Sequence, residues 1–227
     1  MKYEIFLLDA DQTIFDFDKS EKNAIKDVLT NAGLPFNEEI YNTYHIINRD
    51  LWHKYEKGEI ERKDIFSNRF KMLFEKLNFD VKEDLNIKYF DRLASYAYLI
   101  DGAIEFLQEL SNNGKIYLAT NGKISIQNSR INLSGISKYL TNVFVSDLIG
   151  YAKPKKEFFE FIENNIKDFD KQKTVMIGDS LTSDILGGNN FGIDTIWLNF
   201  NNENVMDIKP TYQVKNYNQI LKIIKES

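Results

Sequence analysis

The sequence predicts an α/β protein, with a doubly wound parallel sheet and an inserted all-helical domain. Five short apolar segments of strand length recur along the chain, and most are followed by helical periodicity. This alternation is typical of a parallel sheet covered by helices on both faces. The first two strands are separated by a long stretch that has no strand-like run, which indicates the insertion.

The predicted strands are residues 3–8 (YEIFLL), 115–120 (KIYLAT), 142–146 (NVFVS), 173–179 (KTVMIGD) and 193–198 (IDTIWL). Each is a nearly continuous apolar run, as expected of strands that are buried on both faces. Helical periodicity follows at 124–133, 156–166 and 181–190. Apolar residues at 217, 220, 221 and 224 predict a closing amphipathic helix.

Residues 16–98 differ from the rest of the chain. They are rich in Lys, Glu, Asn, Tyr and Phe, and their apolar residues follow helical spacing. A segment of this length is too long for a connecting loop and indicates a second small domain. We therefore predict a core made of residues 1–15 and 99–227, a helical domain at 16–98, and a surface loop at 201–204.

Composition excludes several classes of protein. With 43% hydrophobic and 28% charged residues in 227, the chain is neither disordered nor fibrous. The absence of cysteine excludes disulfides, thiolate nucleophiles and cysteine-bound metals. His45 and His53 are the only histidines, which excludes a metal site built from several imidazoles. The net charge of −5 argues against a nucleic-acid polymer as partner.

The expected location is the cytoplasm. The opening segment MKYEIFLLDADQT carries charges where a signal peptide needs an apolar core, and no apolar run approaches the roughly 18 residues of a membrane span. We therefore expect no membrane partner. The nucleophile elbow G-x-S-x-G, the P-loop and the dinucleotide fingerprint G-x-G-x-x-G are all missing. The carboxylate side chains therefore remain as the candidates for catalysis.

Asp9 and Asp11 follow the first strand, in the segment Asp9-Ala10-Asp11-Gln12-Thr13. Ligands bind at this edge of open α/β sheets. Two carboxylates at i and i+2 of an extended segment face the same way and repel each other, so they need a cation or a shared proton. The pattern D-x-D-x-T is loose enough to arise by chance, and it acquires weight only from the later strand ends.

Thr120-Asn121-Gly122 ends the next predicted strand and suits the hydrogen-bonding of phosphate oxygens at a helix N-terminus. The same residues also fit an ordinary helix N-cap. Lys153 lies just before a proline that opens a helix, where a lysine is unfavourable for the helix dipole. An isolated lysine of this kind is usually a surface residue, but here it is the cation that the acidic cluster lacks.

Asp179 lies at a strand end, and Asp184 lies in the first turn of the following helix. An aspartate near a helix start is commonly a cap, so neither residue means much by itself. Their value lies in the complete set of strand-end residues.

In this order, D-x-D-x-T, T-N-G, K-P and G-D-x-x-x-x-D resemble motifs I to IV of the haloacid dehalogenase superfamily of phosphohydrolases, over nearly the whole chain. True haloacid dehalogenases lack the second aspartate, so Asp11 implies phosphoryl transfer. The helical insertion after motif I resembles a type C1 cap. The segments DADQTIFDFD, NRDLWHKYEKGEI, LATNG, AKPKKEFF and GDSLTSDILGGNNFGIDTIWLN resemble the YjjG/YfnB group of pyrimidine 5′-nucleotidases. Gln12 departs from the Gly, Glu or Asp often found at its position.

The residues suggest roles without the family name. Asp9 is the expected nucleophile, which forms an aspartyl-phosphate, and Asp11 is the expected general acid and base. Thr120 and the backbone of Asn121 and Gly122 would hold the non-bridging oxygens. Lys153 would offset the charge between Asp9 and the phosphate.

A phosphate dianion among carboxylates needs more positive charge than one lysine supplies, so we expect a divalent metal. Its ligands would be the Asp9 carboxylate, the Asp11 backbone carbonyl, Asp179, the phosphate and waters, an all-oxygen set that suits Mg²⁺. Asp184 is expected behind these ligands, where it would orient Lys153 or a metal-bound water.

Substrate choice is expected in the helical domain. Trp52, His53 and Tyr55 offer an aromatic surface that could stack on a base, with Arg49 or Lys54 nearby for polar contacts. Aromatic residues at helical spacing are also typical of core packing.

These observations predict a cytoplasmic Mg²⁺-dependent phosphomonoesterase. The expected substrate is a small phosphorylated metabolite, a pyrimidine nucleoside monophosphate as the resemblance implies, and the expected assembly is a monomer or homodimer. A sugar-phosphate or phosphoglycolate-type phosphatase and a phosphomutase stay open as alternatives. So does a phospho-aspartate receiver module, although it is normally about half this length and has no helical insertion.

Overall fold

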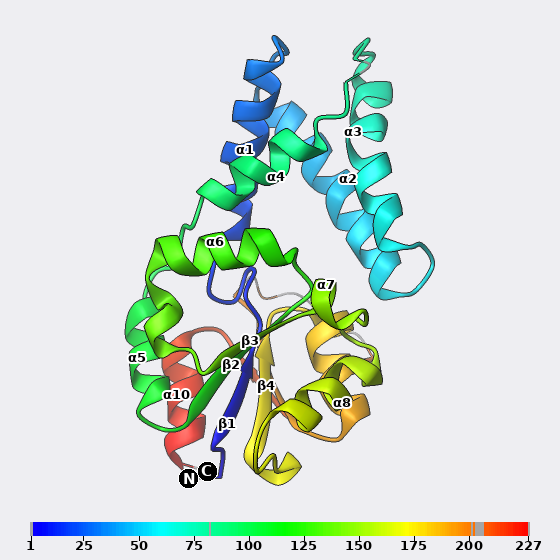
Figure 1. Ribbon diagram of the computed structural model, residues 1–227. Coiled ribbons are helices and arrows are strands. Elements are labelled where there is room, and N and C mark those ends of the chain that lie inside the picture. The colour runs from blue at the N-terminus through cyan, green and yellow to red at the C-terminus, as the bar shows by residue number, and fades with distance from the viewer. Residues whose placement is uncertain (1, 82, 201, 203–206, 227) are drawn as a thin grey trace. The chain divides into compact units, whose positions relative to one another are not determined.

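The computed structural model describes residues 2–81, 83–200, 202 and 207–226 (Figure 1). The chain forms two compact units, the first from residues 1–17 and 97–227 and the second from residues 18–96. The domain boundaries predicted from the sequence lie two residues from these junctions. Most of the predicted surface loop at 201–204 lies outside the described residues.

The first unit contains a sheet of six parallel strands. The strands are β1 (Ile5–Leu8), β2 (Lys115–Thr120), β3 (Asn142–Val145), β4 (Thr174–Gly178), β5 (Asp194–Leu198) and β6 (Tyr212–Val214). They pair in the order β3-β2-β1-β4-β5-β6. The predicted doubly wound parallel sheet is confirmed. The chain winds outward from β1 in one direction and then from β4 in the other, so the topological switch point lies between these two strands.

Alternate residues of the strands pack on opposite faces of the sheet. Phe6 and Leu8 of β1 lie in a core with α5 (Ala103–Ser111) and α10 (Tyr217–Glu226). Ile5 and Leu7 lie in a second core with α8 (Lys156–Asn165) and α9 (Leu186–Phe191). Figure 1 shows α5 and α10 on one side of the sheet and α8 on the other. Because both faces are covered, every residue of β1 is buried, which explains its continuous apolar sequence.

The remaining elements of the first unit are short helices near the strand ends. They are α6 (Ile124–Ser134), η1 (Ile136–Tyr139), α7 (Ser146–Ile149), η2 (Lys171–Lys173) and η3 (Leu181–Ile185). The predicted helix at 181–190 therefore begins with a π-helical turn, η3, before α9 continues it. Helix α5 and strand β6 were not predicted from the sequence.

The regular elements described within residues 18–96 are all helical, as the sequence predicted. They are the main part of α1 (Phe17–Asn31), then α2 (Glu38–Glu56), α3 (Arg62–Leu77) and α4 (Asn86–Ser95). Asn37 caps α2, because its side chain accepts a 2.9 Å hydrogen bond from the Ile40 amide. The aromatic rings of Tyr44, Phe70 and Tyr89 pack together inside the unit.

The two chain segments that lead to and from the second unit lie side by side within the first. Phe15 and Leu99 form an antiparallel bridge. The Asp16 amide donates a 2.9 Å hydrogen bond to the Tyr98 carbonyl. Among the described residues, no helix combines the length and the apolar composition needed to cross a membrane.

Candidate active site

The site predicted from the sequence lies at the carboxyl ends of three neighbouring strands. Asp9 follows β1, Thr120 ends β2, and Asp179 follows β4. Since β1 is paired with both β2 and β4, these residues stand next to one another at the edge of the sheet. Asp9 and Asp179 flank the topological switch point, where open α/β sheets bind their ligands.

Lys153 is a buried cation at the centre of the site, with 1% of its surface exposed. Its Nζ donates to Asp9 Oδ1 at 2.5 Å, to Asp184 Oδ1 at 2.7 Å and to the Ala119 carbonyl. Burial alone would lower the pKa of Lys153, but the carboxylates of Asp184 and Asp9 outweigh it and raise the pKa above its usual value. The lysine is therefore held as a cation.

Asn121 fixes the backbone of Lys153. The Asn121 side chain accepts from the Lys153 amide and donates to the Lys153 carbonyl, both at 2.9 Å. This reciprocal pair joins the end of β2 to the segment before α8. The Asn121 side chain thus has a structural role. The predicted contact with phosphate oxygens would be made by the Asn121 backbone.

Asp184 is fully buried and is oriented by the π-helical turn η3. Its Oδ2 accepts from the Ser180 amide at 3.1 Å, and its Oδ1 accepts from Lys153. A Cβ at Gly178 would lie 2.1 Å from Asp184 Oδ2, so only glycine fits there. Because both carboxylate oxygens already accept hydrogen bonds, Asp184 is suited to hold Lys153 in place.

Asp179 is held mainly through its backbone. Its carbonyl accepts from Trp197 Nε1 at 2.8 Å, and its Oδ1 accepts a long 3.3 Å bond from the Thr13 hydroxyl. The Tyr217 hydroxyl in turn donates to the Thr13 carbonyl at 2.6 Å. The Asp179 carboxylate consequently keeps capacity to bind a further group.

The acidic cluster fits a divalent cation. Ligand oxygens of Asp9, Asp179 and Asp184 lie within 4.8 Å of one another. Burial raises the pKa of Asp9 and of Asp179 well above the usual value, and the carboxylates repel one another. When all three carboxyl groups are ionised, Lys153 leaves an excess of two negative charges in this cluster, and an all-oxygen donor set is the environment that Mg²⁺ prefers.

Asp11 is bound by two residues that the sequence analysis did not identify. Its Oδ2 accepts from Gln127 Nε2 at 2.8 Å, and its Oδ1 accepts from Arg130 Nη1. Both partners lie on α6 and are fully buried. One feature of the sequence could have pointed to them. A glutamine and an arginine three residues apart follow the T-N-G segment, and the predicted site needs more positive charge.

Gln12 directly follows Asp11 and has a left-handed backbone, with φ of 58°. Its side-chain Oε1 accepts a 3.0 Å hydrogen bond from the Phe17 amide at the start of α1. The residue therefore caps a helix, which is a local structural role.

The predicted specificity residues lie in the second unit, on the C-terminal half of α2. Trp52 and His53 are half-buried and Arg49 is exposed. The Trp52 ring meets Tyr55 edge-on at a centroid distance of 5.8 Å. All the other predicted site residues lie in the first unit.

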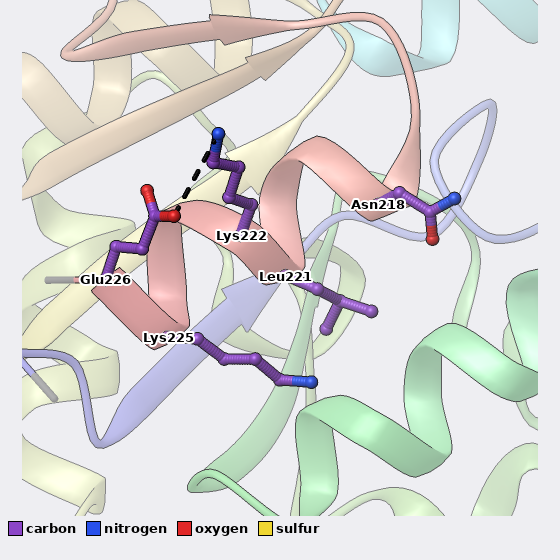
Figure 2. Close-up of a pocket in the computed structure, with 5 residues that line it drawn as sticks. All are labelled: Asn218, Leu221, Lys222, Lys225 and Glu226. Carbon is purple, nitrogen blue, oxygen red and sulfur yellow. Dashed lines mark ion pairs between the residues drawn. The ribbon is translucent and has the colours of Figure 1, made fainter.

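A shallow pocket on α10 has no chemistry of this kind. Figure 2 shows Lys222 paired with Glu226 and the remaining side chains spread along one helix. Lys225 is paired with Glu109 of α5. We assign no function to this surface.

Comparison with known families agrees with the geometry of the strand-end site. The family model described as haloacid dehalogenase-like hydrolase matches residues 3–192. The chain belongs to this family. The strand-end carboxylates and Lys153 all lie within the residues that this family model matches.

Three relatives match over nearly their whole length. The pyrimidine 5′-nucleotidase PynA of Streptococcus pneumoniae is 38% identical, over 97% of this chain and 94% of its own. The HAD-hydrolase YfnB of Bacillus subtilis is 32% identical over 98% and 96%. The pyrimidine 5′-nucleotidase YjjG of Escherichia coli is 30% identical over 99% of both chains. The prediction of a phosphoric monoester hydrolase of this superfamily is confirmed.

Solved structures give the same result. A crystal structure of Bacillus subtilis YfnB bound to magnesium superposes with a TM-score of 0.93, at 33% identity and with 99% of both chains covered. An L-2-haloacid dehalogenase from Xanthobacter autotrophicus reaches a TM-score of 0.73 at 15% identity over 98% of both chains, which shows the common fold alone. The alternative of a receiver module is not supported.

Proposed function

We propose that this hydrolase is a Mg²⁺-dependent 5′-nucleotidase that cleaves pyrimidine nucleoside monophosphates through an aspartyl-phosphate. The observation that carries the chemistry is the ion pair of Asp9 with buried Lys153 at the switch point of the sheet. A carboxylate so oriented, beside a site with an excess of two negative charges, suits an attack on phosphorus assisted by a divalent cation.

In the first step, an oxygen of Asp9 attacks phosphorus in line, and the bond from phosphorus to the nucleoside oxygen breaks. Asp11 gives its proton to that leaving oxygen. Thr120 and the backbone of Asn121 and Gly122 hold the non-bridging oxygens, while Lys153 offsets the negative charge. The products are the nucleoside and a phosphorylated Asp9.

In the second step, ionised Asp11 takes a proton from water as the water attacks phosphorus. The bond from phosphorus to the Asp9 oxygen breaks, which releases inorganic phosphate. Asp11 ends protonated, and Asp9 is again a carboxylate. One residue thus serves as acid and then as base.

The carboxylates of Asp9 and Asp179 and the backbone carbonyl of Asp11 would hold Mg²⁺. When bound, Mg²⁺ supplies positive charge that offsets the phosphate dianion. Asp184 holds Lys153 through its 2.7 Å contact, so that the ammonium stays beside Asp9. Support for this metal comes from the acidic cluster and from the magnesium-bound structure of YfnB.

The nucleotide preference rests on the relatives PynA and YjjG, both of which are named as pyrimidine 5′-nucleotidases. We assign base selectivity to the second unit, through stacking by Trp52 and His53 and a polar contact from Arg49. The half-buried aromatic surface of Trp52 is the support within this chain.

The test is phosphate release from a panel of nucleoside monophosphates, sugar phosphates and phosphoglycolate, measured with Mg²⁺ and with a chelator. We expect Mg²⁺-dependent release that is strongest for UMP, dUMP and dTMP. A preference for a sugar phosphate would retain the roles of Asp9, Asp11, Lys153 and Asp179 and overturn the base selectivity. No release from any substrate would overturn the proposed function.

Trp52→Ala tests the selectivity separately. We expect a loss of about tenfold in kcat/KM for UMP, since stacking on one base contributes about 1–3 kcal/mol, and no change for 4-nitrophenyl phosphate. Tyr151→Ala, at an exposed aromatic residue of the first unit, is the matched control. An equal loss on both substrates would show that Trp52 only packs the helical unit.

A further inference from the structure

Helix α6 carries a hydrogen-bonded pair that contacts two groups of the site together. Gln127 Nε2 donates to Asp11 Oδ2 at 2.8 Å and to Thr120 Oγ1 at 3.1 Å. Arg130 Nη1 donates to Asp11 Oδ1 and to Gln127 Oε1, the latter at 3.4 Å. One amide and one guanidinium thus join the predicted acid and base to the predicted phosphate ligand.

The contacts of Thr120 determine what its hydroxyl can offer. A threonine hydroxyl has one hydrogen to donate and two lone pairs that accept. The Gly122 amide donates to Thr120 Oγ1 at 3.0 Å, and Gln127 donates to the same oxygen. With both lone pairs engaged, the hydroxyl hydrogen is the group that remains for a phosphate oxygen. Gln127 therefore sets Thr120 as a donor.

The orientation of the Gln127 amide is itself determined by Arg130. Because the guanidinium has only donors, it faces the amide oxygen of Gln127 and leaves the NH₂ group to Asp11 and Thr120. Arg130 has no exposed surface, and its guanidinium lies 4.2 Å from the centre of the Phe15 ring. A stacked, buried arginine of this kind has little freedom to turn.

The glycine of the T-N-G segment makes room for this arrangement. A Cβ at Gly122 would lie 2.4 Å from Gln127 Nε2, which is closer than any real contact. The approach of the Gln127 amide to Thr120 and Asp11 thus depends on the missing side chain at this position.

We propose that Gln127 and Arg130 are positioning residues that orient the two catalytic groups together, Asp11 toward the leaving oxygen and the Thr120 hydroxyl toward the phosphate. This inference rests on the proposed function, in which Asp11 is the general acid and base. Arg130 is also a buried cation of the site, and it pairs with Asp11 in the ionised form that acts as the base in the second step.

Gln127→Glu is the decisive variant, since it keeps the size of the side chain and an acceptor for Arg130 but removes both donated hydrogen bonds. The first step is measured under single-turnover conditions with UMP, whose alkoxide leaving group needs a proton, and with 2,4-dinitrophenyl phosphate, whose leaving group does not. We expect a loss of about 100-fold with UMP and a loss several-fold smaller with the aryl ester. Inhibition by inorganic phosphate should also weaken, because Thr120 loses its orientation.

Two further variants keep the result interpretable. Arg130→Lys retains a cation but lacks the planar guanidinium. We therefore expect a loss of about tenfold with UMP and a smaller loss with the aryl ester. Gln108→Glu introduces the same charge on an exposed position of α5 and should leave both substrates unchanged. If Gln127→Glu does not fold, Arg130→Lys alone decides the inference.

Asp11→Asn, in the same assay, separates this inference from the proposed function. If it shows no dependence on the leaving group, the acid role of Asp11 is wrong and the positioning role falls with it. If Asp11→Asn shows the dependence and the folded Gln127 and Arg130 variants lose both substrates equally, or neither, the proposed function stands and the positioning role is overturned.

Discussion

Both units of this hydrolase bury ionised groups, and the two sets differ in their balance. In the first unit, Asp9 and Asp184 share Lys153, while Asp179 adds a carboxylate that lacks a cation of its own among these groups. In the second unit, Glu21 is fully buried and accepts 2.7 Å bonds from His45 and from Asn48.

Buried charges that are paired indicate a structural role. A buried cluster with an excess of one sign of charge indicates a binding site for a ligand of the opposite sign. Burial raises the pKa of Glu21, and the His45 and Asn48 contacts oppose that rise. The Asp179 carboxylate accepts a longer 3.3 Å bond from the Thr13 hydroxyl, and its pKa is raised further by the neighbouring carboxylates. A bound cation would balance the first set, whereas in the second set the Glu21 carboxylate is met by hydrogen bonds from His45 and Asn48.

The largest expected effect is on turnover. Asp9→Asn removes the proposed nucleophile while Lys153 keeps its contact with Asp184, so we expect activity on UMP to fall by about 10⁴-fold or more in a folded protein. Steady-state phosphate release and circular dichroism check this result. Glu21→Gln, the corresponding change in the second unit, should leave kcat within about threefold. Retained activity in Asp9→Asn would exclude the nucleophile assignment.

Lys153→Met tests whether the pairing of Lys153 with Asp9 and Asp184 also stabilises the fold. It leaves Asp9 and Asp184 buried without their shared cation, so we expect a loss of about 3–5 kcal/mol in the free energy of unfolding. Chemical denaturation measures it. Lys156→Met, at a lysine paired with Glu160 on the surface of α8, is the control and should cost less than 1 kcal/mol. Similar losses in the two variants would contradict the buried pairing.

Magnesium should stabilise the wild-type protein by about 2.7 kcal/mol at a hundredfold excess over its Kd. The shift in melting temperature on adding Mg²⁺ measures this effect. Asp179→Asn should abolish the shift because it removes a proposed ligand, and Glu21→Gln should retain it. A shift that survives in Asp179→Asn would place the metal elsewhere.

The smallest effect concerns His45. Its hydrogen bond with Glu21 raises the pKa of His45 above the unfolded value of about 6.5, although burial opposes the rise. The charged imidazole therefore stabilises the fold fully below that pH, and the contribution is lost as the pH rises through the folded value. His45→Gln should cost about 1–2 kcal/mol at pH 6 and less at pH 9. Urea unfolding at both pH values measures the difference, and a pH-independent cost would show that the charge contributes nothing.

The sequence was most informative about the sheet. Strands buried on both faces are continuous apolar runs, and five of them were located to within two residues at either end. Strand β6 was missed because it has three residues and a single buried side chain, Val214. The carboxyl ends of parallel strands converge, so the closeness of Asp9, Thr120 and Asp179 followed from the predicted fold.

Gln127 and Arg130 could not be identified from periodicity. Their helix, α6, turns these polar side chains inward, and such residues look like a solvent-facing surface in the sequence. Likewise, the pairing of the Asn121 side chain with the Lys153 backbone joins residues 32 positions apart. Both arrangements depend on tertiary packing, which local patterns do not encode.

The bridge between Phe15 and Leu99 has a consequence for how this protein can be modified. The chain departs for the helical unit and returns beside its own starting point, within hydrogen-bonding distance at Asp16 and Tyr98. A short turn could therefore replace residues 18–96 within the connection from β1 to β2 and leave the order and pairing of the strands unchanged. The helical unit could in the same way be exchanged for that of a relative, which would test whether it carries the proposed substrate selectivity.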